Sequence, residues 1–204
     1  MIRFIATACA VIWASLANGE VAIKVTNSPG GIQAWSVEEP SIPFTALDLI
    51  FAGGAALDPE GKRGAAYLMT GLLEEGAENM DAQAFAAAQE ALAASFRFNV
   101  YDDNLTISVR FLTENKKASL ALLKTALMFP RFDQAAIDRV RGQVLSNISS
   151  KAKDPDSVAS ATWDSLAFGD HPYGGALEGT EVSVQSLSRA DMKAAHKRLL
   201  VRDT

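Results

Sequence analysis

The sequence predicts an α+β fold, in which a mixed or antiparallel sheet is packed on one side by several helices. Short apolar or alternating segments gather in the first half of the chain, and longer segments with helical periodicity dominate the second half. Runs of strands beside runs of helices are typical of this layered class. With 204 residues, of which 49% are hydrophobic, the chain is long enough to bury one sizeable core.

Residues 1–19 are predicted to be a secretory signal peptide. Arg3 supplies the positive charge, an apolar run follows at 4–16, and small residues end the segment. The run is about 13 residues long, which is too short to span a bilayer well. Cleavage is expected between Ala17 and Gly19, and it predicts an exported, periplasmic protein with no membrane attachment afterwards. A buried first helix is the alternative for this segment.

The domain that follows, over residues 20–204, is expected to open with strands. Two short strands are predicted at 21–26 and 32–39, around a turn that contains Pro29 and two glycines. A third strand is predicted over 42–54 and is expected to be largely buried, because apolar residues dominate it without strict alternation.

Two helices and a hairpin are expected next. The helix over 64–76 opens after a glycine-containing turn and carries leucines at helical spacing. Asp81 is predicted to cap an alanine-rich helix over 81–94, since aspartate favours this position and alanine favours helices. Alternating apolar residues over 95–112, with a turn at 102–104, predict a β-hairpin.

Helices are predicted for most of the remaining chain. One covers 114–128, and the next carries a clear apolar stripe at helical spacing, formed by Ile137, Val140, Val144 and Ile148. After a break that contains a proline, further helices are predicted over 157–168 and 188–200, with a loop at 169–180 between them.

Composition argues against several kinds of partner and chemistry. The formal net charge of −5 does not favour nucleic acid, which usually requires a basic face. The only two histidines are His171 and His196, one in a predicted loop and one on a predicted helix. A Gly-x-Ser-x-Gly elbow and a phosphate-binding loop are both missing from the sequence, so serine-hydrolase and nucleotide chemistry find no support.

Four segments in a fixed order carry a family resemblance. They are the helix that starts at Gly64, the stretch 139–148, the sequence His171-Pro172-Tyr173-Gly174, and Gly179-Thr180. Together they resemble the N-terminal domain of the insulinase/pitrilysin zinc peptidases. The resemblance covers roughly residues 21–204 and implies the insulinase/pitrilysin-type, LuxS/peptidase-like fold. The chain stops at Thr204 without a closing element, so the domain is predicted to be truncated at its C-terminal end.

The resemblance also places the zinc chemistry of active members on particular residues. In those members one helix supplies a histidine, a glutamate three residues on and a second histidine four residues on, and a later helix supplies a distal glutamate. Here the two histidine positions hold Tyr67 and Gly71, the general-base position holds Thr70, and the distal position, 76 residues after Gly71, holds Asn147. Zinc requires imidazole, thiolate or carboxylate ligands. No catalytic residue, metal site or cofactor is therefore expected in this chain.

A peptide-docking strand is the second feature that the resemblance implies. In the family, substrate peptide adds as a strand to an exposed sheet edge, and the matching residues here are Ala94, Ser95, Phe96 and Arg97. Backbone pairing does not require catalytic side chains, so docking is compatible with loss of zinc. An ordinary hairpin strand is the alternative reading of these four residues.

The resemblance implies a catalytically silent subunit that pairs with a zinc-bearing homologue and helps enclose and hold peptide substrate. Zinc is then expected only in the partner subunit. Two alternatives remain: a structural or peptide-binding protein with no peptidase partner, and an active zinc metallopeptidase that uses other ligands. Fold analogy alone does not decide among them.

Overall fold

The computed structural model describes residues 22–201, which divide into two units at Ile42. In the first unit, β1 (Lys24–Asn27) and β2 (Gln33–Ser36) form an antiparallel hairpin with all residues exposed. This confirms the two predicted strands, although both are shorter than expected. The predicted signal peptide lies outside the described residues, and the truncation predicted at Thr204 also stays a prediction.

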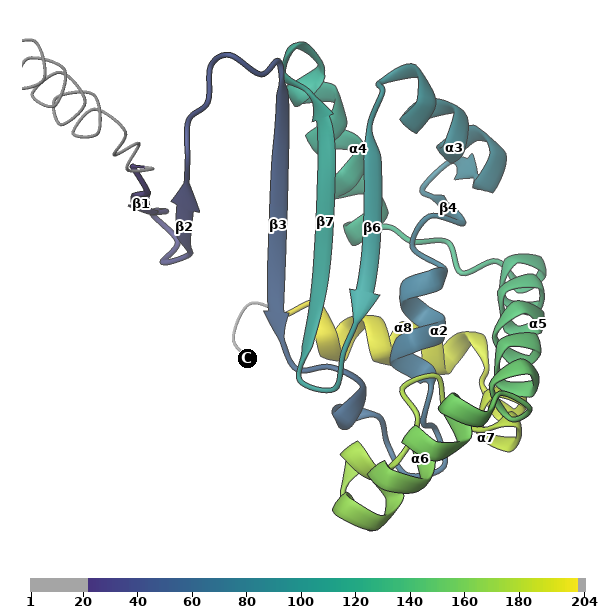
Figure 1. Cartoon of the computed structure of the whole chain (residues 1–204). Coiled ribbons are helices and arrows are strands. Elements are labelled where there is room, and N and C mark those ends of the chain that lie inside the picture. Colours follow the sequence, from purple (N-terminus) through teal and green to yellow (C-terminus); the bar gives the residue numbers. More distant parts are fainter. Residues whose placement is uncertain (1–21, 202–204) are drawn as a thin grey trace, which may run out of the picture. The chain divides into compact units, whose positions relative to one another are not determined.

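A three-stranded antiparallel sheet organises the second unit. Its order is β3 (Phe44–Ala52), β7 (Asn104–Leu112) and β6 (Ser95–Val100), so β7 is central and the other two are edge strands (Figure 1). β6 and β7 form the hairpin predicted over 95–112 and pair in register. All the described strands pair antiparallel. Of the two sheet types expected from the sequence, mixed or antiparallel, the structure has the antiparallel one.

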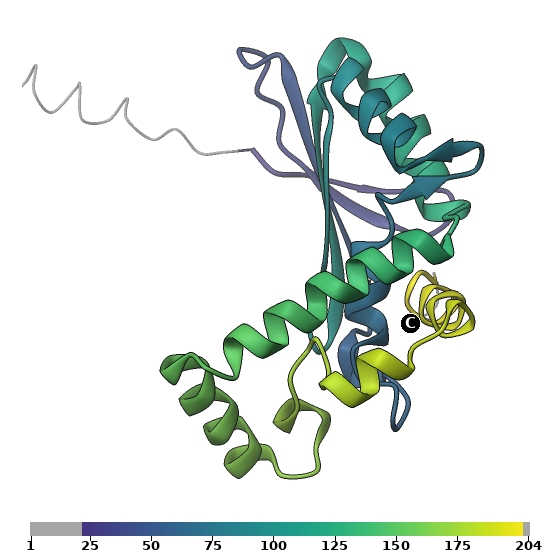
Figure 2. The same cartoon turned by 90° about the vertical axis from the view of Figure 1, so that its right-hand side faces the viewer.

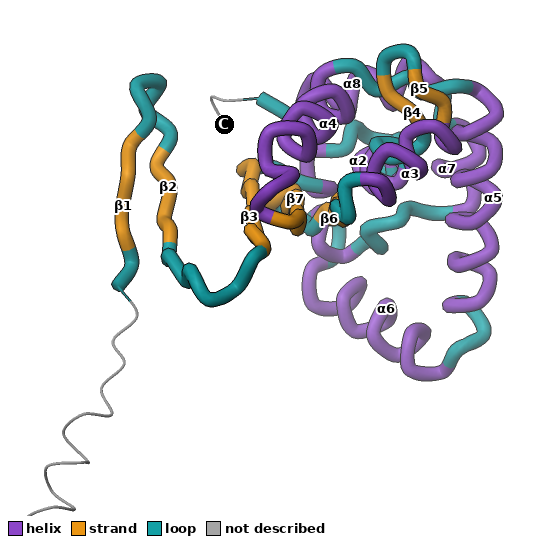
Figure 3. The backbone as a smooth tube through the Cα atoms, turned by 90° about the horizontal axis from the view of Figure 1, so that it is seen from above, coloured by secondary structure: helices purple, strands orange, loops and turns teal. Residues whose placement is uncertain are grey.

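Only one face of this sheet is covered by helices. Helices α4 (Lys116–Met128) and α8 (Arg189–Leu199) lie on the same side of it in the view from above (Figure 3). β7 turns Leu105, Ile107, Val109 and Phe111 into the core. The expectation of a largely buried strand over 42–54 is therefore wrong: Phe44, Ala46, Asp48, Ile50 and Ala52 are exposed, and the β3 residues between them are only partly buried.

The core lies between the sheet and the helices. α3 (Ala82–Ala91) buries Phe85, whose ring centroid lies 6.3 Å from that of Phe96 on β6. α2 (Ala65–Gly71) packs against both α8 and β6. The remaining elements are η1 (Ala55–Leu57), β4 (Gly76–Ala77), β5 (Met80–Asp81), η2 (Thr113–Asn115), α5 (Gln134–Lys151), α6 (Pro155–Phe168), η3 (Pro172–Gly174) and α7 (Glu181–Ser186).

Two local predictions need correction. The helix expected over 64–76 ends at Gly71, because the chain then turns into the small β4–β5 hairpin, where Gly76 and Glu78 both have positive φ. A separate helix, α7, follows the loop that was expected at 169–180. Thr180 and Ser183 form a capping box at its start, which stabilises even a helix this short.

Helix α6 exposes large apolar side chains to solvent. It continues from α5 at the lower end of the second unit (Figure 2), and none of its residues is buried. Trp163 and Leu166 are 70% and 80% exposed, whereas Asp156, Ser160 and Asp164 line a cavity toward the rest of the unit. Among the described helices, none is both long and apolar enough to cross a membrane.

Burial predicts a large loss of stability for one aromatic truncation and almost none for another. Phe85→Ala should lower the free energy of unfolding by about 3–5 kcal/mol, because it empties a fully buried site. Trp163→Ala should change it by less than about 0.5 kcal/mol, since the indole is mostly in solvent. Urea denaturation of the two variants measures both effects, and equal losses would contradict the assignment of the core.

Candidate functional site

A cavity of about 270 Å³ brings together the four positions to which the zinc chemistry was assigned. Tyr67, Thr70 and Gly71 lie on one wall, and Asn147 lies on another. The walls come from α2, α5 and the end of β6, three elements separated by long stretches of sequence. The spacing of 76 residues between Gly71 and Asn147 therefore corresponds to a real convergence in space.

Helix α2 presents its three site residues from one face. Positions 67, 70 and 71 are related by three and four residues, so they are neighbours on a helix. Leu68 and Met69 point instead into the core and are fully buried. The hydroxyl of Thr70 donates to the backbone carbonyl of Tyr67 at 2.8 Å. This bond engages the one proton that the Thr70 hydroxyl can donate.

Helix α5 forms the second wall. Its apolar stripe buries Val140 and Val144 against the unit, while Gln143 and Asn147 line the cavity one turn apart. Gly71 lies directly opposite this stripe: a Cβ atom placed on it would be 3.1 Å from Cγ1 of Val140. Val140 therefore fills the space into which a side chain at position 71 would begin to extend.

The third wall is the end of β6, where Phe98, Asn99 and Val100 line the cavity. β6 runs down to α2 in Figure 1, and its other neighbour in the sheet is β7. The residues expected to dock peptide occupy the preceding part: Ala94 lies just before the strand, and Ser95, Phe96 and Arg97 form its first half. Phe96 is buried in the core. Peptide docking at these four residues stays a prediction.

The donor groups at the four positions do not fit a zinc ion. They are a phenol, a hydroxyl that is already hydrogen bonded, a hydrogen atom and a carboxamide, whereas zinc is bound by thiolate, imidazole or carboxylate. Within residues 22–201, no group of three or more histidine, cysteine, aspartate or glutamate side chains is placed to hold a metal ion. No hydrolytic step through a metal can be derived from these residues.

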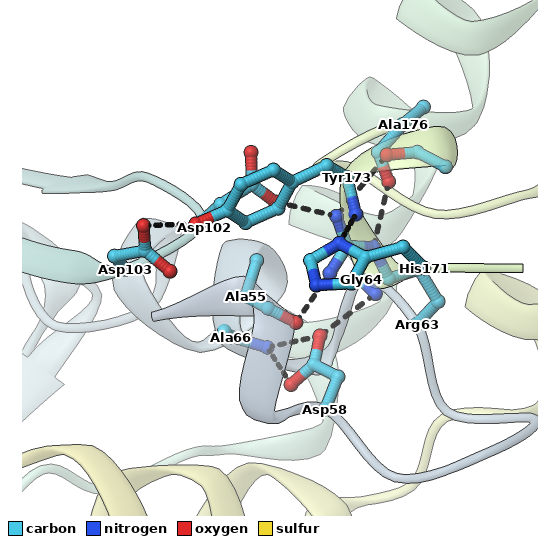
Figure 4. Close-up of polar contacts among 11 residues, drawn as sticks. Ala55, Asp58, Arg63, Gly64, Ala66, Asp102, Asp103, His171, Tyr173 and Ala176 are labelled. Carbon is cyan, nitrogen blue, oxygen red and sulfur yellow. Dashed lines mark hydrogen bonds and ion pairs between the residues drawn. The ribbon is translucent and has the colours of Figure 1, made fainter. Parts of the chain in front are cut away.

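The position of α2 is set by a carboxylate outside the cavity. The side chain of Asp58 is fully buried and accepts from the backbone N–H groups of Gly64 and Ala66 at 3.0 and 3.1 Å (Figure 4). Arg198 of α8 donates to the same carboxylate at 2.7 Å. Burial raises the pKa of Asp58, and the bond from Ala66 and the charge of Arg198 oppose that rise. Asp58 thus caps α2 and ties it to α8.

Arg63 ties the loop over 169–180, which contains two of the segments that carry the family resemblance, to the start of α2. Its guanidinium donates to the carbonyls of Ala55, Gly175 and Ala176 and pairs with Asp102 at 2.8 Å (Figure 4). Gly179 has a φ of 84°, and a Cβ there would lie 2.2 Å from the carbonyl oxygen of Arg63. The glycine that precedes Thr180 is therefore required by close packing.

The two histidines have structural contacts. Nδ1 of His171 accepts from the backbone N–H of Tyr173 at 3.3 Å, at the start of η3. Nε2 of His196 lies 2.8 Å from the carbonyl oxygen of Leu127, and its ring packs edge-on against Phe132. His171 makes a local loop contact, while His196 is half-buried and joins α8 to the end of α4.

The fold is that of a domain of the zinc-peptidase type, and the four positions to which the sequence resemblance assigned the zinc chemistry line one cavity. The model of the family described as Insulinase (Peptidase family M16) matches residues 34–181. The chain belongs to this family.

Two relatives share more than a quarter of their aligned residues with this chain. The non-peptidase homolog YmxG of Helicobacter pylori is 31% identical over 156 residues, which are 76% of this chain and 36% of the relative. The crystal structure of a peptidase M16 inactive domain from Pseudomonas fluorescens has a TM-score of 0.81 and 28% identity, over 86% of this chain and 43% of that one. The chain thus spans less than half the length of these relatives.

A third comparison supports the fold alone. The crystal structure of a protease from Helicobacter pylori has a TM-score of 0.76 and 18% identity, over 86% of this chain and 43% of that one. Residues that the sequence did not reveal, Asp58 and Arg63 above all, hold the start of α2 in this chain. The only sequence signal for them is their place in the turn before the helix.

Loss of Asp58 should destabilise the protein strongly. Asp58→Ala is expected to lower the free energy of unfolding by about 3–5 kcal/mol, because it leaves Arg198 without its buried partner and two helix N–H groups without an acceptor. Asp138→Ala is the control, since Asp138 is 55% exposed in its pair with Arg141, and it should cost less than about 1 kcal/mol. Chemical denaturation measures both, and similar costs would contradict the role given to Asp58.

Metal analysis tests the reading of the four zinc positions. After dialysis against a zinc-containing and then a zinc-free buffer, the purified chain is expected to retain far less than one zinc ion per molecule. A zinc peptidase taken through the same dialysis is the control. One zinc per chain that disappears in Asn147→Ala would show that the cavity holds metal after all.

Proposed function

We propose that the chain is a catalytically silent peptidase-family subunit that pairs with a zinc-bearing homologue and helps to enclose and hold peptide substrate. The observation that carries this proposal is the convergence of Tyr67, Thr70, Gly71 and Asn147 in one cavity beside an edge strand. The scaffold of the family is present, and the groups at the reacting positions cannot bind zinc or act as a base near neutral pH.

Two comparisons support catalytic silence. The Helicobacter pylori relative is called a non-peptidase homolog, and the Pseudomonas fluorescens structure is called an inactive domain. The same conclusion follows for this chain from its residues: Thr70 stands at the general-base position, and its hydroxyl already donates to the backbone. A base for water requires a carboxylate, an imidazole or a similar group.

The edge strand supports the holding of peptide. In the described sheet β6 pairs only with β7, so its other side is available for an added strand over the part that α2 does not cover. A peptide paired with β6 would run past Phe98, Asn99 and Val100 into the cavity. Main-chain pairing supplies affinity in such complexes without any catalytic side chain.

Pairing and location complete the proposal. Zinc would be supplied by the partner subunit, and substrate would be held between the two chains. Export to the periplasm follows from the predicted signal peptide at residues 1–19. Neither nucleic acid nor a membrane is expected as a partner of the mature chain.

Reconstitution with the zinc-bearing homologue tests the accessory role. The pair is expected to cleave a fluorogenic peptide with a KM on the order of tenfold lower than the partner alone, because a second set of contacts holds the same substrate. Asn147→Trp, which fills the cavity, should remove most of this gain. Ser146→Trp is the matched control, since Ser146 is an exposed neighbour on α5 that does not line the cavity.

The outcome separates the remaining alternatives. If the partner alone cleaves as fast as the pair, the accessory role fails. Peptide binding by the isolated chain would then favour a structural or peptide-binding protein, whereas metal-dependent cleavage by the isolated chain would show an active metallopeptidase.

A further inference from the structure

The cavity beside β6 has an uncharged lining throughout. All ten lining residues are neutral, although 21% of the chain is charged. Valine and phenylalanine side chains supply its apolar part. Its polar part consists of the carboxamides of Asn99, Gln143 and Asn147 and the hydroxyls of Tyr67 and Thr70.

These polar side chains have hydrogen-bonding capacity to offer a ligand. Over residues 22–201, the carboxamides of Asn99, Gln143 and Asn147 and the phenol of Tyr67 make no hydrogen bond to another group of the protein. Each carboxamide carries both donors and an acceptor, and the phenol can act in either sense. A ligand group that both donates and accepts can therefore find partners on all three walls.

Three charged residues that neighbour the cavity along the chain are engaged elsewhere, and Arg97, which precedes Phe98, is exposed and does not line the cavity. Arg139 pairs with Glu75, and Arg141 donates to Asp138 and to the carbonyl of Leu187. Glu74 accepts from Gln89. A charged side chain that entered the cavity would find no counter-ion among the lining residues, whereas a neutral amide would exchange water for comparable hydrogen bonds.

From this lining we infer that the cavity selects an uncharged, hydrogen-bonding residue of the bound peptide, with glutamine or asparagine as the best fit. This inference rests on the proposed function, the holding of peptide, and specifies which kind of peptide residue the cavity selects. A volume of about 270 Å³ lies just below the usual range for pockets that take whole small molecules. It suits one side chain of a longer ligand held along β6.

Peptides that differ at one position provide the test. Fluorescein-labelled nonapeptides of alternating threonine and valine, with glutamine, alanine, glutamate or lysine at the centre, are titrated against the full chain in buffer with a chelator. Fluorescence anisotropy gives each Kd. The glutamine peptide should bind on the order of tenfold more tightly than the glutamate and lysine peptides, with alanine between them.

A charge placed in the cavity should redirect this selectivity. Asn147→Glu introduces a carboxylate, so the lysine peptide should gain affinity and the glutamate peptide should lose it. Ser146→Glu adds the same charge one residue away, on an exposed position outside the cavity, and should leave the order of the four peptides unchanged.

Two results would overturn the inference and are distinguishable from each other. If the four peptides bind with equal affinity, the cavity does not select the central residue, while the proposed holding of peptide stands. If none of them binds, either alone or with the zinc-bearing partner, the holding of peptide fails and its specificity fails with it.

Discussion

The buried carboxylate of Asp58 is the contact on which the geometry of the cavity depends. It accepts from the first N–H groups of α2 and from Arg198 of α8, so one side chain fixes where α2 begins and what it packs against. Gly64 strengthens this constraint, because a Cβ there would lie 2.3 Å from the carbonyl oxygen of Glu178. Because Tyr67, Thr70 and Gly71 lie on α2, these contacts also determine where the three residues stand in the cavity.

Scaffold and site are held in part by different residues. The capping carboxylate and the Arg63 contacts maintain the helix, and Val140 and Val144 serve both core and cavity. The carboxamides of Asn99, Gln143 and Asn147, by contrast, belong to exposed residues outside the core. Such a division allows the chemistry at the cavity to change without loss of the domain. It is also compatible with a family fold that carries a phenol, a hydroxyl and a carboxamide at the positions to which the resemblance assigns the zinc chemistry.

How much the sequence could predict depended on the range of the interactions involved. Periodicity within one element was sufficient for the hairpin over 95–112 and for the stripe of Val140 and Val144 on α5. The cavity positions followed from the resemblance, because spacing along the chain carries over between members of a family. The end of α2 at Gly71 was missed, since the β4–β5 hairpin that follows has strands of two residues each, too short to show a period.

Contacts between distant segments were beyond the reach of sequence reasoning. Asp58 and Arg198 are 140 positions apart, and neither has a local pattern that points to the other. The exposed side of β3 was missed for a related reason. Apolar content indicates a strand, but whether Ile50 is covered depends on which helices lie over the sheet, and they lie on its other face.

The contact between Gly71 and Val140 bears on whether the lost chemistry could return by mutation. A histidine at position 71 would have its Cβ 3.1 Å from Cγ1 of Val140, a contact that crowds one methyl group at the edge of the cavity. Val140 would have to become smaller or shift by a few tenths of an ångström to accommodate that histidine. At this helix pair a histidine at position 71 would thus require an adjustment of Val140 as well as a change of chemistry.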